Sequence, residues 1–582
     1  MSLSVEQRTF ADAEGKIVLC ACPGSGKTYT VAHKLSMYLA AWTEQHKGVA
    51  TLSFTNIASQ EIQHKVKELS VNGVSATYPH LIATIDSFLN QYIFLRYAYL
   101  LTEQEKKPHL SQTNIEFPFR WWRSECRRNG CTKAIQEFRW SIDDKTYRNN
   151  ELVQCAGGRY GPPCDQYKNM LIRKGIFFQN DVPYISYLIL EKYPQIAKAL
   201  AERFPIILLD EAQDTSKEQM AILDLLANAG VKTFCIVGDP DQAIYEWRNA
   251  SASCFINKIN DDNWNTLFLS ENRRSSQAIC NATKYFSKMN ECKAPNIAVG
   301  GDKDFGQKPE LILINGNTDI ESIHGYFLQR CSELGIERTK DNIAILTRGR
   351  IHKETDITGL WKSDEVELLA KASYCWQYSS KRESYNLCSK CLYLMFIGSP
   401  HESKHDILFE IESKISYEIW KRMCYQLLCN LPSADLSISI WIEKMKEVLN
   451  QLDTTLDFVD GHSIKDVIKI KLRDKNNPDF KSIPIKCFFE KKNQDTITIS
   501  SIHGVKGQTF EATLLYAPST TGATITRAGL TNGDLDNEHI RAAYVAMTRP
   551  KKYLAVVLQK PSKNSDLPLN RFPLELWNYK EL

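Results

Sequence analysis

The chain of 582 residues is predicted to be an α/β protein built on open parallel sheets, and three observations support this prediction. Short apolar runs end in polar, glycine-rich turns, the pattern of buried parallel strands that lead into helices. Apolar residues make up 43% of the chain and charged residues 24%, which is enough apolar side chain for sizeable cores. Two stretches, from about Asn90 to Ala201 and from about Ile351 to Gln494, break this rhythm and are predicted to be mainly helical insertions.

Six apolar runs are predicted to be strands, because each is short and lies beside a turn signal. In chain order they are residues 16–20, 204–209, 233–237, 496–500, 512–516 and 553–558. Ligands of parallel sheets bind at the carboxyl ends of the strands. We therefore expect the functional residues directly after these runs.

The overall composition excludes some classes of protein but does not indicate a function. The net charge is 72 − 68 = +4, which does not indicate a nucleic-acid binder, although a local basic groove is compatible with it. No apolar run approaches the roughly 18 residues of a membrane span, and the first residues lack the pattern of a signal peptide. The 17 cysteines are an odd number spread along the chain, so we expect reduced thiols and a cytoplasmic protein without a membrane partner.

A phosphate-loop pattern follows the first predicted strand. Small residues in such a loop let backbone N–H groups curl around phosphates. We expect Lys27 to reach the β- and γ-phosphates of ATP and the Thr28 hydroxyl to hold Mg²⁺. The alternative is a glycine-rich turn that binds nothing, and the Lys-Thr pair after an apolar strand argues against it. The loop consists of Ala21, where the general form has Gly, and of Cys22, Pro23, Gly24, Ser25, Gly26, Lys27 and Thr28.

An acidic pair, Asp210 and Glu211, ends the second predicted strand. Buried carboxylates are costly unless they meet a cation. Asp210 suits a water-mediated contact with Mg²⁺, and Glu211 is placed to orient or deprotonate the attacking water. Taken alone, such a pair is usually a solvated helix start; beside a phosphate loop, the nucleotide interpretation is favoured.

The third predicted strand leads into residues 237–248. In this segment the chain resembles the UvrD/Rep-type superfamily-1 DNA helicases. The segment reads Val-Gly-Asp-Pro-Asp-Gln-Ala-Ile-Tyr-Glu-Trp-Arg. Further segments resemble motifs of this family in the family's order. They are Gln7 in residues 3–7, and residues 52–56, 272–275, 501–507 and 538–549.

The resemblance implies two RecA-like parallel-sheet cores that face each other, with ATP in the cleft and two inserted domains. Residues 1–89 and 202–270 are expected to form the first core, and residues 90–201 its helical insertion. Residues 271–350 and 495–582 are expected to form the second core, and residues 351–494 its short helical insertion.

The resemblance also assigns roles in ATP hydrolysis. Gln7 corresponds to the family's adenine-reading glutamine, Gln242 to its γ-phosphate contact, and Arg274 and Arg549 to arginine fingers supplied by the second core. Surface ion pairs are the alternative role for the two arginines. Arg273 replaces an aromatic residue that stacks on adenine, and a guanidinium plane can also stack. The expected catalytic residues are Lys27, Asp210, Glu211, Gln242, Arg274 and Arg549; Arg273, Gly507, Gln7 and the phosphate loop are expected to bind ATP.

A second set of residues is expected to bind single-stranded DNA. Phe54, Tyr245, Trp247 and His503 would stack on successive bases, which tolerates any base sequence as a translocating motor requires. The alternative role for such aromatic residues is in a hydrophobic core. The remaining expected DNA contacts are Thr55, Asn56, Thr84 and Arg248. The family moves 3′ to 5′, and the resemblance implies this polarity here.

Some features depart from the family. Asp86 replaces the usual histidine of a DNA-contacting motif, and Thr509 replaces a common glutamate at the ribose. The second insertion is short, 494 − 351 + 1 = 144 residues, and 582 − 549 = 33 residues follow Arg549, too few for a fused nuclease. Compact helicases of this kind resemble those of bacterial anti-phage systems such as Gabija, whose partner is an OLD-family nuclease.

The leading hypothesis is an ATP-driven, Mg²⁺-dependent 3′-to-5′ translocase that binds single-stranded DNA and unwinds duplex DNA. The main rival is an ATPase that senses DNA or nucleotide and licenses a partner nuclease without useful unwinding. An RNA helicase is a third, weaker hypothesis. Two cysteine groups are weaker candidates for zinc or an iron–sulfur cluster: Cys388, Cys391, Cys424 and Cys429, and Cys126, Cys131, Cys155 and Cys164.

Overall fold

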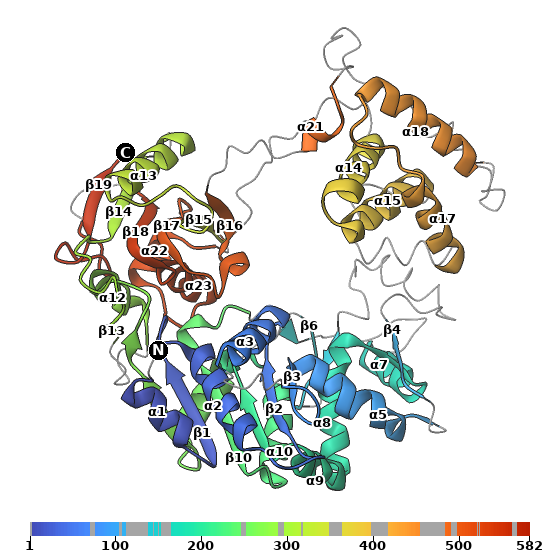
Figure 1. Cartoon of the computed structure of the whole chain (residues 1–582), viewed down its shortest axis with the longest axis vertical. Helices are drawn as coiled ribbons and strands as arrows, with labels where there is room; N and C mark the ends of the chain where they lie inside the picture. Colours follow the sequence, from blue (N-terminus) through green and yellow to red (C-terminus); the bar gives the residue numbers. More distant parts are fainter. Residues whose placement is uncertain are drawn as a thin grey trace. The chain divides into compact units, whose positions relative to one another are not determined.

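The computed structural model divides the chain into two compact units (Figure 1). The first unit comprises Met1–Leu110, Ile135–Ile351 and Asp495–Leu582, and the second comprises Ser111–Ala134 and His352–Gln494. The structure describes all residues except 1–2, 70–75, 104–106, 112–137, 144, 149–150, 153–163, 246–251, 289–295, 316–317, 349–363, 397–416, 454–482, 490–496, 521, 523 and 562–566.

The first unit contains a parallel sheet of six strands in the order β11-β1-β10-β9-β2-β3. Both faces of this sheet are buried. On β1, Val18 and Cys20 join one hydrophobic cluster, and Ile17 and Leu19 join another. The strands are β1 (Lys16–Ala21), β2 (Val49–Ser53), β3 (Leu81–Thr84), β9 (Ile206–Leu209), β10 (Thr233–Gly238) and β11 (Asn265–Leu269).

Helices follow the strands of this sheet, as the alternating pattern predicts. They include α2 (Lys27–Ala41), α3 (Asn56–Leu69), α10 (Lys217–Asn228) and α11 (Ala252–Ile259), while α1 (Val5–Asp12) precedes β1. Because β1, β9 and β10 are neighbours in the sheet, the segments that follow them meet at one edge.

A second parallel sheet of six strands has the order β16-β15-β17-β18-β14-β19. The α12 (Gln277–Thr283), α13 (Ile320–Glu333), α22 (Arg527–Asn532) and α23 (Glu538–Met547) helices belong to this part. Its strands are β14 (Glu310–Ile314), β15 (Ile343–Thr347), β16 (Thr498–Ser501), β17 (Phe510–Tyr516), β18 (Pro550–Gln559) and β19 (Asn578–Glu581).

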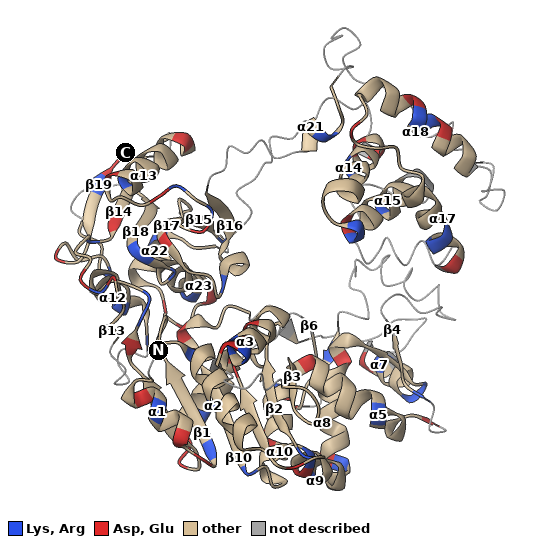
Figure 2. Cartoon of the chain, in the orientation of Figure 1, with Lys and Arg blue, Asp and Glu red and all other residues tan. Residues whose placement is uncertain are grey.

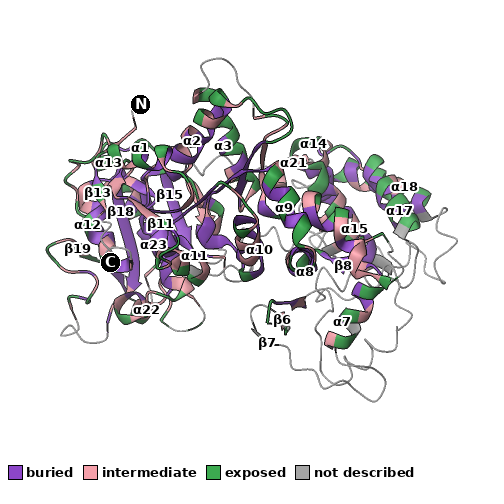
Figure 3. Ribbon diagram, turned by 90° about the horizontal axis from the view of Figure 1, so that it is seen from below, coloured by how far each residue is buried: buried purple, intermediate pink, exposed green. Residues whose placement is uncertain are grey.

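The predicted α/β fold with two parallel sheets is confirmed. The six predicted strands correspond to β1, β9, β10, β16, β17 and β18. Five of them, β1, β9, β10, β17 and β18, are mostly buried, as the purple β18 in Figure 3 illustrates, whereas β16 is only partly buried.

Residues 90–201, which are expected to form the first insertion, contain short strands as well as helices. Among the described residues, β4 (His109–Ser111) and β8 (Ile176–Phe178) form one small sheet, and β5 (Arg139–Trp140), β6 (Thr146–Arg148) and β7 (Glu151–Leu152) form another. The helices include α5 (Leu95–Tyr97), α7 (Cys164–Arg173), α8 (Val182–Lys192) and α9 (Pro194–Arg203), and the short α4 (Ile85–Phe88) precedes them.

The second unit is helical in its described part. Its core surrounds two buried tryptophans, Trp420 and Trp441, and includes Cys388, Cys391 and Cys424. The helices are α14 (Asp364–Tyr378), α15 (Lys381–Phe396), α17 (Tyr417–Cys429), α18 (Ile438–Asp453) and the short α21 (Lys486–Phe489). Figure 2 shows both signs of charge on helices of each unit, for example on α3 and α18.

Among the described residues, no helix is long and apolar enough to cross a membrane.

Candidate functional site

The phosphate loop connects β1 to α2 at the carboxyl edge of the first sheet. Gly24 (φ 74°) and Gly26 (φ 81°) adopt the left-handed conformation that favours glycine, and Gly26 precedes the first turn of α2. The Lys27 ammonium group lies 3.4 Å from the carbonyl oxygen of Ala21 and 3.8 Å from Oδ2 of Asp239. Backbone N–H groups at a helix N-terminus and a lysine beside them form the arrangement that binds phosphate.

Strand β9, which β10 separates from β1 in the sheet, places a carboxylate beside this loop. Thr28 Oγ1 donates a hydrogen bond to Oδ2 of Asp210 over 3.0 Å. Burial, followed by the charge of Glu211, raises the pKa of Asp210 to about 7. A buried carboxylate with this pKa and an adjacent hydroxyl oxygen fit a hard divalent cation such as Mg²⁺, whose charge would favour the ionised form.

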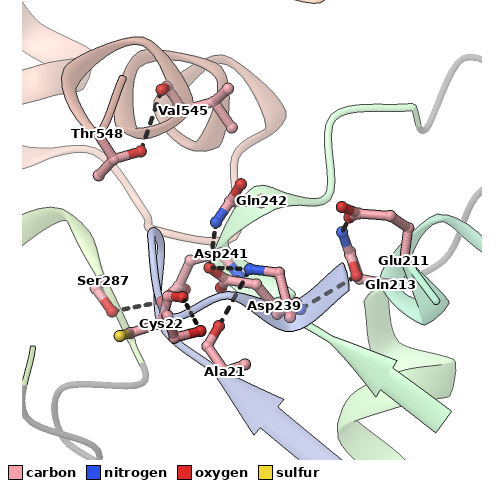
Figure 4. A network of polar contacts seen from close by, with 12 residues as sticks. Ala21, Cys22, Glu211, Gln213, Asp239, Asp241, Gln242, Ser287, Val545 and Thr548 are labelled. Atoms are coloured by element: carbon pink, nitrogen blue, oxygen red, sulfur yellow. Dashed lines mark hydrogen bonds and ion pairs between the residues drawn. The ribbon is translucent and has the colours of Figure 1, made fainter. Parts of the chain in front are cut away.

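Glu211 has an unusual backbone and a fixed side chain. Its φ of 55° is in the left-handed region, where non-glycine residues are strained and often functional. Gln213 holds it, donating through Nε2 to Glu211 Oε2 while its own Oε1 accepts from the N–H of Asp239 (Figure 4). Burial acts to raise the pKa of Glu211, but Lys506 and Lys27 outweigh it and lower the pKa. Glu211 is therefore ionised and suited to accept a proton.

Gln242 connects the first sheet to the second. Its side chain donates to Asp239 Oδ2 (Figure 4), and its Oε1 accepts from Nη2 of Arg549 over 3.0 Å. Arg549 follows α23 and is 2% exposed. Burial lowers the pKa of Arg549 to about 10. The guanidinium stays charged at neutral pH, and a fully buried cation here favours an anionic ligand.

Arg274 lies at the same junction. Its Nη1 donates to the carbonyl of Thr548 over 3.0 Å, and burial together with the charge of Arg549 lowers its pKa to about 9. The preceding residue, Arg273, donates its backbone N–H to the carbonyl of Gly24 over 2.9 Å. A side chain at Gly24 would collide with Asn272, so the close approach of this segment to the phosphate loop requires glycine.

The expected adenine-binding residues lie at different degrees of burial. Gln7 is buried in the first turn of α1, and its Nε2 donates to the carbonyl of Ser25 in the phosphate loop over 3.1 Å. Arg273 is exposed and forms an ion pair with Glu271 at 2.9 Å. Gly507 is exposed, with a φ of 89°. An adenine contact of any of these residues stays a prediction.

Three of the four expected stacking residues form a row. The ring centroids of Phe54 and Tyr245 are 5.1 Å apart, and those of Tyr245 and His503 are 5.6 Å apart. Phe54 directly follows β2, Tyr245 follows the 3₁₀ turn (Pro240–Gln242) after β10, and His503 lies in the 3₁₀ turn (Ile502–Val505) after β16. Trp247 and Arg248 lie outside the described residues.

The remaining expected DNA contacts stand at helix starts. Thr55 Oγ1 accepts from the N–H of Ala58 before α3, and Thr84 Oγ1 accepts from the N–H of Ser87 as the cap of α4. Asn56 is the exposed first residue of α3. Their contact with DNA also stays a prediction.

The sequence reasoning missed several charged residues of this junction. Lys506 donates to Oδ2 of Asp214 over 2.5 Å and to the carbonyl of Gln242 over 3.2 Å. Burial raises the pKa of Asp214 to about 7, although Lys506 opposes the shift. Arg541 donates through Nε to the carbonyl of Ala243 over 2.7 Å. The signal for Lys506 was present, since it belongs to the His-x-x-Lys-Gly segment that carries His503.

No group of three or more His, Cys, Asp or Glu side chains among the described residues could hold a metal ion by itself. Cys429 is exposed, whereas Cys388, Cys391 and Cys424 are buried. Cys126, Cys131 and Cys155, with the side chain of Cys164, lie outside the described part.

Two family models match the chain. One describes the UvrD/REP helicase N-terminal domain and matches residues 3–263, and the other describes the UvrD-like helicase C-terminal domain and matches residues 440–561. Among curated proteins, the ATP-dependent DNA helicase PcrA of Staphylococcus aureus is 24% identical over 321 residues, or 54% of this chain and 41% of that protein. PcrA of Staphylococcus epidermidis is 26% identical over 316 residues, or 52% of this chain and 42% of that protein. The matched part thus spans less than half the length of these relatives.

Proposed function

Because the chain belongs to the UvrD-type superfamily-1 helicases, we propose that it is an ATP-dependent DNA helicase that hydrolyses ATP when stimulated by DNA. The observation that supports this most directly is the hydrogen bond between Gln242 and Arg549, which brings a buried cation of the second sheet to the phosphate-loop edge of the first. Fixed guanidinium groups that reach a γ-phosphate stabilise the charge of the transition state.

In the proposed reaction, Lys27 and the N–H groups of the phosphate loop bind the phosphates of ATP. Gln7 fixes this loop through Ser25, and its proposed contact with adenine follows from the family resemblance. Glu211, held ionised by Lys506 and Lys27, orients the attacking water and accepts its proton. Arg274 and Arg549 stabilise the charge on the transferred phosphoryl group.

Thr28 and Asp210 are the residues that would hold Mg²⁺. When bound, this ion neutralises charge on the phosphate oxygens. The buried Asp210 carboxylate gains from a nearby cation, because burial disfavours its charge. These roles account for the burial of Asp210 at the end of β9 and for its hydrogen bond to the partly buried Thr28 at the start of α2.

Single-stranded DNA is proposed to cross the row of Phe54, Tyr245 and His503, with Trp247 continuing it. Bases stack on such rings irrespective of sequence. Thr55, Asn56, Thr84 and Arg248 are proposed to contact the DNA backbone. Movement 3′ to 5′ is part of the proposal and follows from the family resemblance. So is a cytoplasmic location, which agrees with cysteines that form no disulfide among those described.

A strand-displacement assay tests this function. The substrates are duplexes with a single-stranded tail at either the 3′ or the 5′ end, incubated with ATP and Mg²⁺. We expect displacement on the 3′-tailed duplex and none by Lys27→Ala. Displacement on the 5′-tailed duplex alone would contradict the polarity, and stimulation by RNA but not DNA would identify an RNA helicase instead.

A second candidate is an ATPase that regulates a partner nuclease, and one observation favours it. The Asp86 carboxylate stands where relatives have a histidine toward DNA, and it is exposed. Phosphate is repelled by such a charge, which weakens the grip on DNA. On this proposal the partner is an OLD-family nuclease in anti-phage defence. DNA-stimulated hydrolysis without displacement on either duplex, together with ATP-dependent control of the nuclease, would support it.

A further inference from the structure

The first turn of α10 lies between the catalytic acidic segment and a motif expected to contact DNA. The chain passes from Glu211 through a 3₁₀ turn (Ala212–Asp214) to Ser216, the cap of α10. Ser216 Oγ accepts from the N–H of Gln219 over 3.2 Å, and Gln219 Oε1 accepts from the N–H of Ser216 over 3.0 Å. This reciprocal capping box fixes the position of Gln219.

The other end of the Gln219 amide reaches the DNA motif. Its Nε2 donates to Oδ1 of Asp86 over 2.8 Å, and Gln219 is only 5% exposed. Asp86 belongs to the first turn of α4, the helix that Thr84 caps. One amide group therefore caps α10 with its oxygen and holds the DNA motif with its nitrogen.

Glu218, next to Gln219, binds the same turn to residues of the expected first insertion. Glu218 is 3% exposed, and its Oε1 accepts from Nη1 of Arg139 over 3.0 Å and from Oγ of Ser141 over 2.6 Å. Charge-assisted hydrogen bonds in a buried setting are among the stronger polar contacts of a protein. The first turn of α10 is thus bound both to α4, through Gln219, and to residues 139–141, through Glu218.

Hydrogen bonds also link the segment before this turn to Glu211 and to Lys506. The N–H of Asp214 donates to the carbonyl of Glu211 over 3.0 Å, and the side chain of Asp214 accepts from Lys506. A displacement of the α10 turn would therefore move the backbone that sets Glu211 and the carboxylate that pairs with Lys506.

We propose that the Asp86–Gln219 hydrogen bond is a relay that makes ATP hydrolysis respond to DNA, with Gln219 as a positioning residue. DNA that engages Thr84 and α4 moves Asp86, and Gln219 passes this movement to the α10 turn and to Glu211. The inference rests on the proposed DNA-stimulated ATPase. It differs from the simple repulsion of phosphate by Asp86, which would change DNA affinity and leave the response at saturating DNA intact.

The test is a double-mutant cycle that exchanges the donor and the acceptor. Gln219→Glu retains the capping box, in which glutamate is equally suitable, but places a second carboxylate against Asp86. Asp86→Asn in the same chain supplies a new donor toward Glu at 219. ATP hydrolysis is measured without DNA and over a range of single-stranded DNA concentrations, and thermal unfolding is recorded for each variant.

We expect Gln219→Glu to lower the stimulation at saturating DNA by about threefold to tenfold, a coupling of the size reported along such networks. Hydrolysis without DNA should be unchanged. Asp86→Asn with Gln219→Glu should restore most of the stimulation, because the hydrogen bond re-forms with reversed polarity.

Gln329→Glu is the matched control. Gln329 on α13 donates to Glu333 over 3.0 Å, so this variant likewise places a second carboxylate against an acidic partner, on a helix that belongs to the second-sheet part. It should leave stimulation unchanged. Unchanged stimulation in Gln219→Glu, a change confined to DNA affinity, or failure of the double variant to recover would overturn the relay. A wild-type chain without DNA stimulation would instead contradict the proposed function.

Discussion

Three aspartates, Asp210, Asp214 and Asp239, are buried at the carboxyl ends of β9 and β10, each at most 2% exposed. Burial raises the pKa of these groups to about 7, 7 and 6. The nearby cations, Lys27 and Lys506, reduce these shifts without removing them. A site built in this way carries a cost in stability at neutral pH, which is typical of functional sites.

The first prediction concerns the pH dependence of stability in Asp210→Asn. A carboxyl group whose pKa is raised from 3.8 to about 7 binds its proton more tightly in the folded state, so its contribution to the free energy of unfolding falls as pH rises through this window. The asparagine variant lacks this loss. Measured without Mg²⁺ or nucleotide, the free energy of unfolding of the variant minus that of wild type should be about 2–3 kcal/mol larger at pH 8 than at pH 5.

Chemical unfolding at both pH values measures this gain. Asp224→Asn serves as the control, because Asp224 is partly exposed and paired with Lys258 at 2.7 Å. If the difference in free energy of unfolding between Asp210→Asn and wild type were the same at both pH values, burial would not hold Asp210 in its neutral form.

At the scale of elements, α1 is held to α2 by a buried lysine. Lys34 is 1% exposed, and its Nζ donates to the carbonyl groups of Phe10, Ala11 and Ala13 at the end of α1. Burial lowers the pKa of Lys34. The start of α1 is fixed by the capping box of Ser4 and Gln7. Both ends of the helix that carries Gln7 are thereby tied down.

Lys34→Met is predicted to loosen this helix. The substitution retains most of the apolar stem but leaves the carbonyl groups without their donor, which should lower the free energy of unfolding by about 1–3 kcal/mol. Because α1 positions Gln7 against Ser25, KM for ATP should rise as well. Thermal unfolding and steady-state hydrolysis measure the two effects.

Lys16→Met is the control for this prediction, since the Lys16 ammonium group is exposed and donates to Asn228 over 3.1 Å. A Lys34→Met variant as stable as Lys16→Met and with an unchanged KM would refute a positioning role for Lys34.

The elements that could be predicted from the sequence are those whose signal is local. The apolar runs of β1, β9 and β10 and the glycines of the phosphate loop lie within a few residues of one another, so pattern and backbone geometry suffice. The polar contacts between distant segments left no such signal. Lys506 and Asp214 are 292 residues apart in sequence, and Gln219 and Asp86 are 133 apart. Only the folded sheets bring these pairs together.

At the scale of the whole molecule, the two sheets are linked by polar contacts. Arg549 contacts Gln242, Arg541 contacts the carbonyl of Ala243, and Ser287 donates to Asp241 (Figure 4). Hydrogen bonds of this kind can be exchanged for contacts with a ligand, and beside them Ile244 packs into the hydrophobic cluster of the second sheet. This junction therefore suits an enzyme whose two cores close on ATP and reopen after hydrolysis.

The second unit occupies a defined place in the chain between two paired strands. β15 ends at Thr347, β16 begins at Thr498, and the two strands pair in parallel, with Ala344 opposite Thr498. The chain can thus leave and rejoin the second sheet at neighbouring strands. We propose the boundaries given by the sequence, residues 351–494, for this insertion and residues 90–201 for the first.

The proposed coupling of ATP hydrolysis to DNA is tested most directly by steady-state ATP hydrolysis of the purified chain, with and without single-stranded DNA, beside Glu211→Gln. We expect strong stimulation by DNA and a loss of about 10²–10⁴ in kcat when Glu211 can no longer accept a proton. Hydrolysis that ignores DNA, or a Glu211→Gln variant with wild-type turnover, would contradict it.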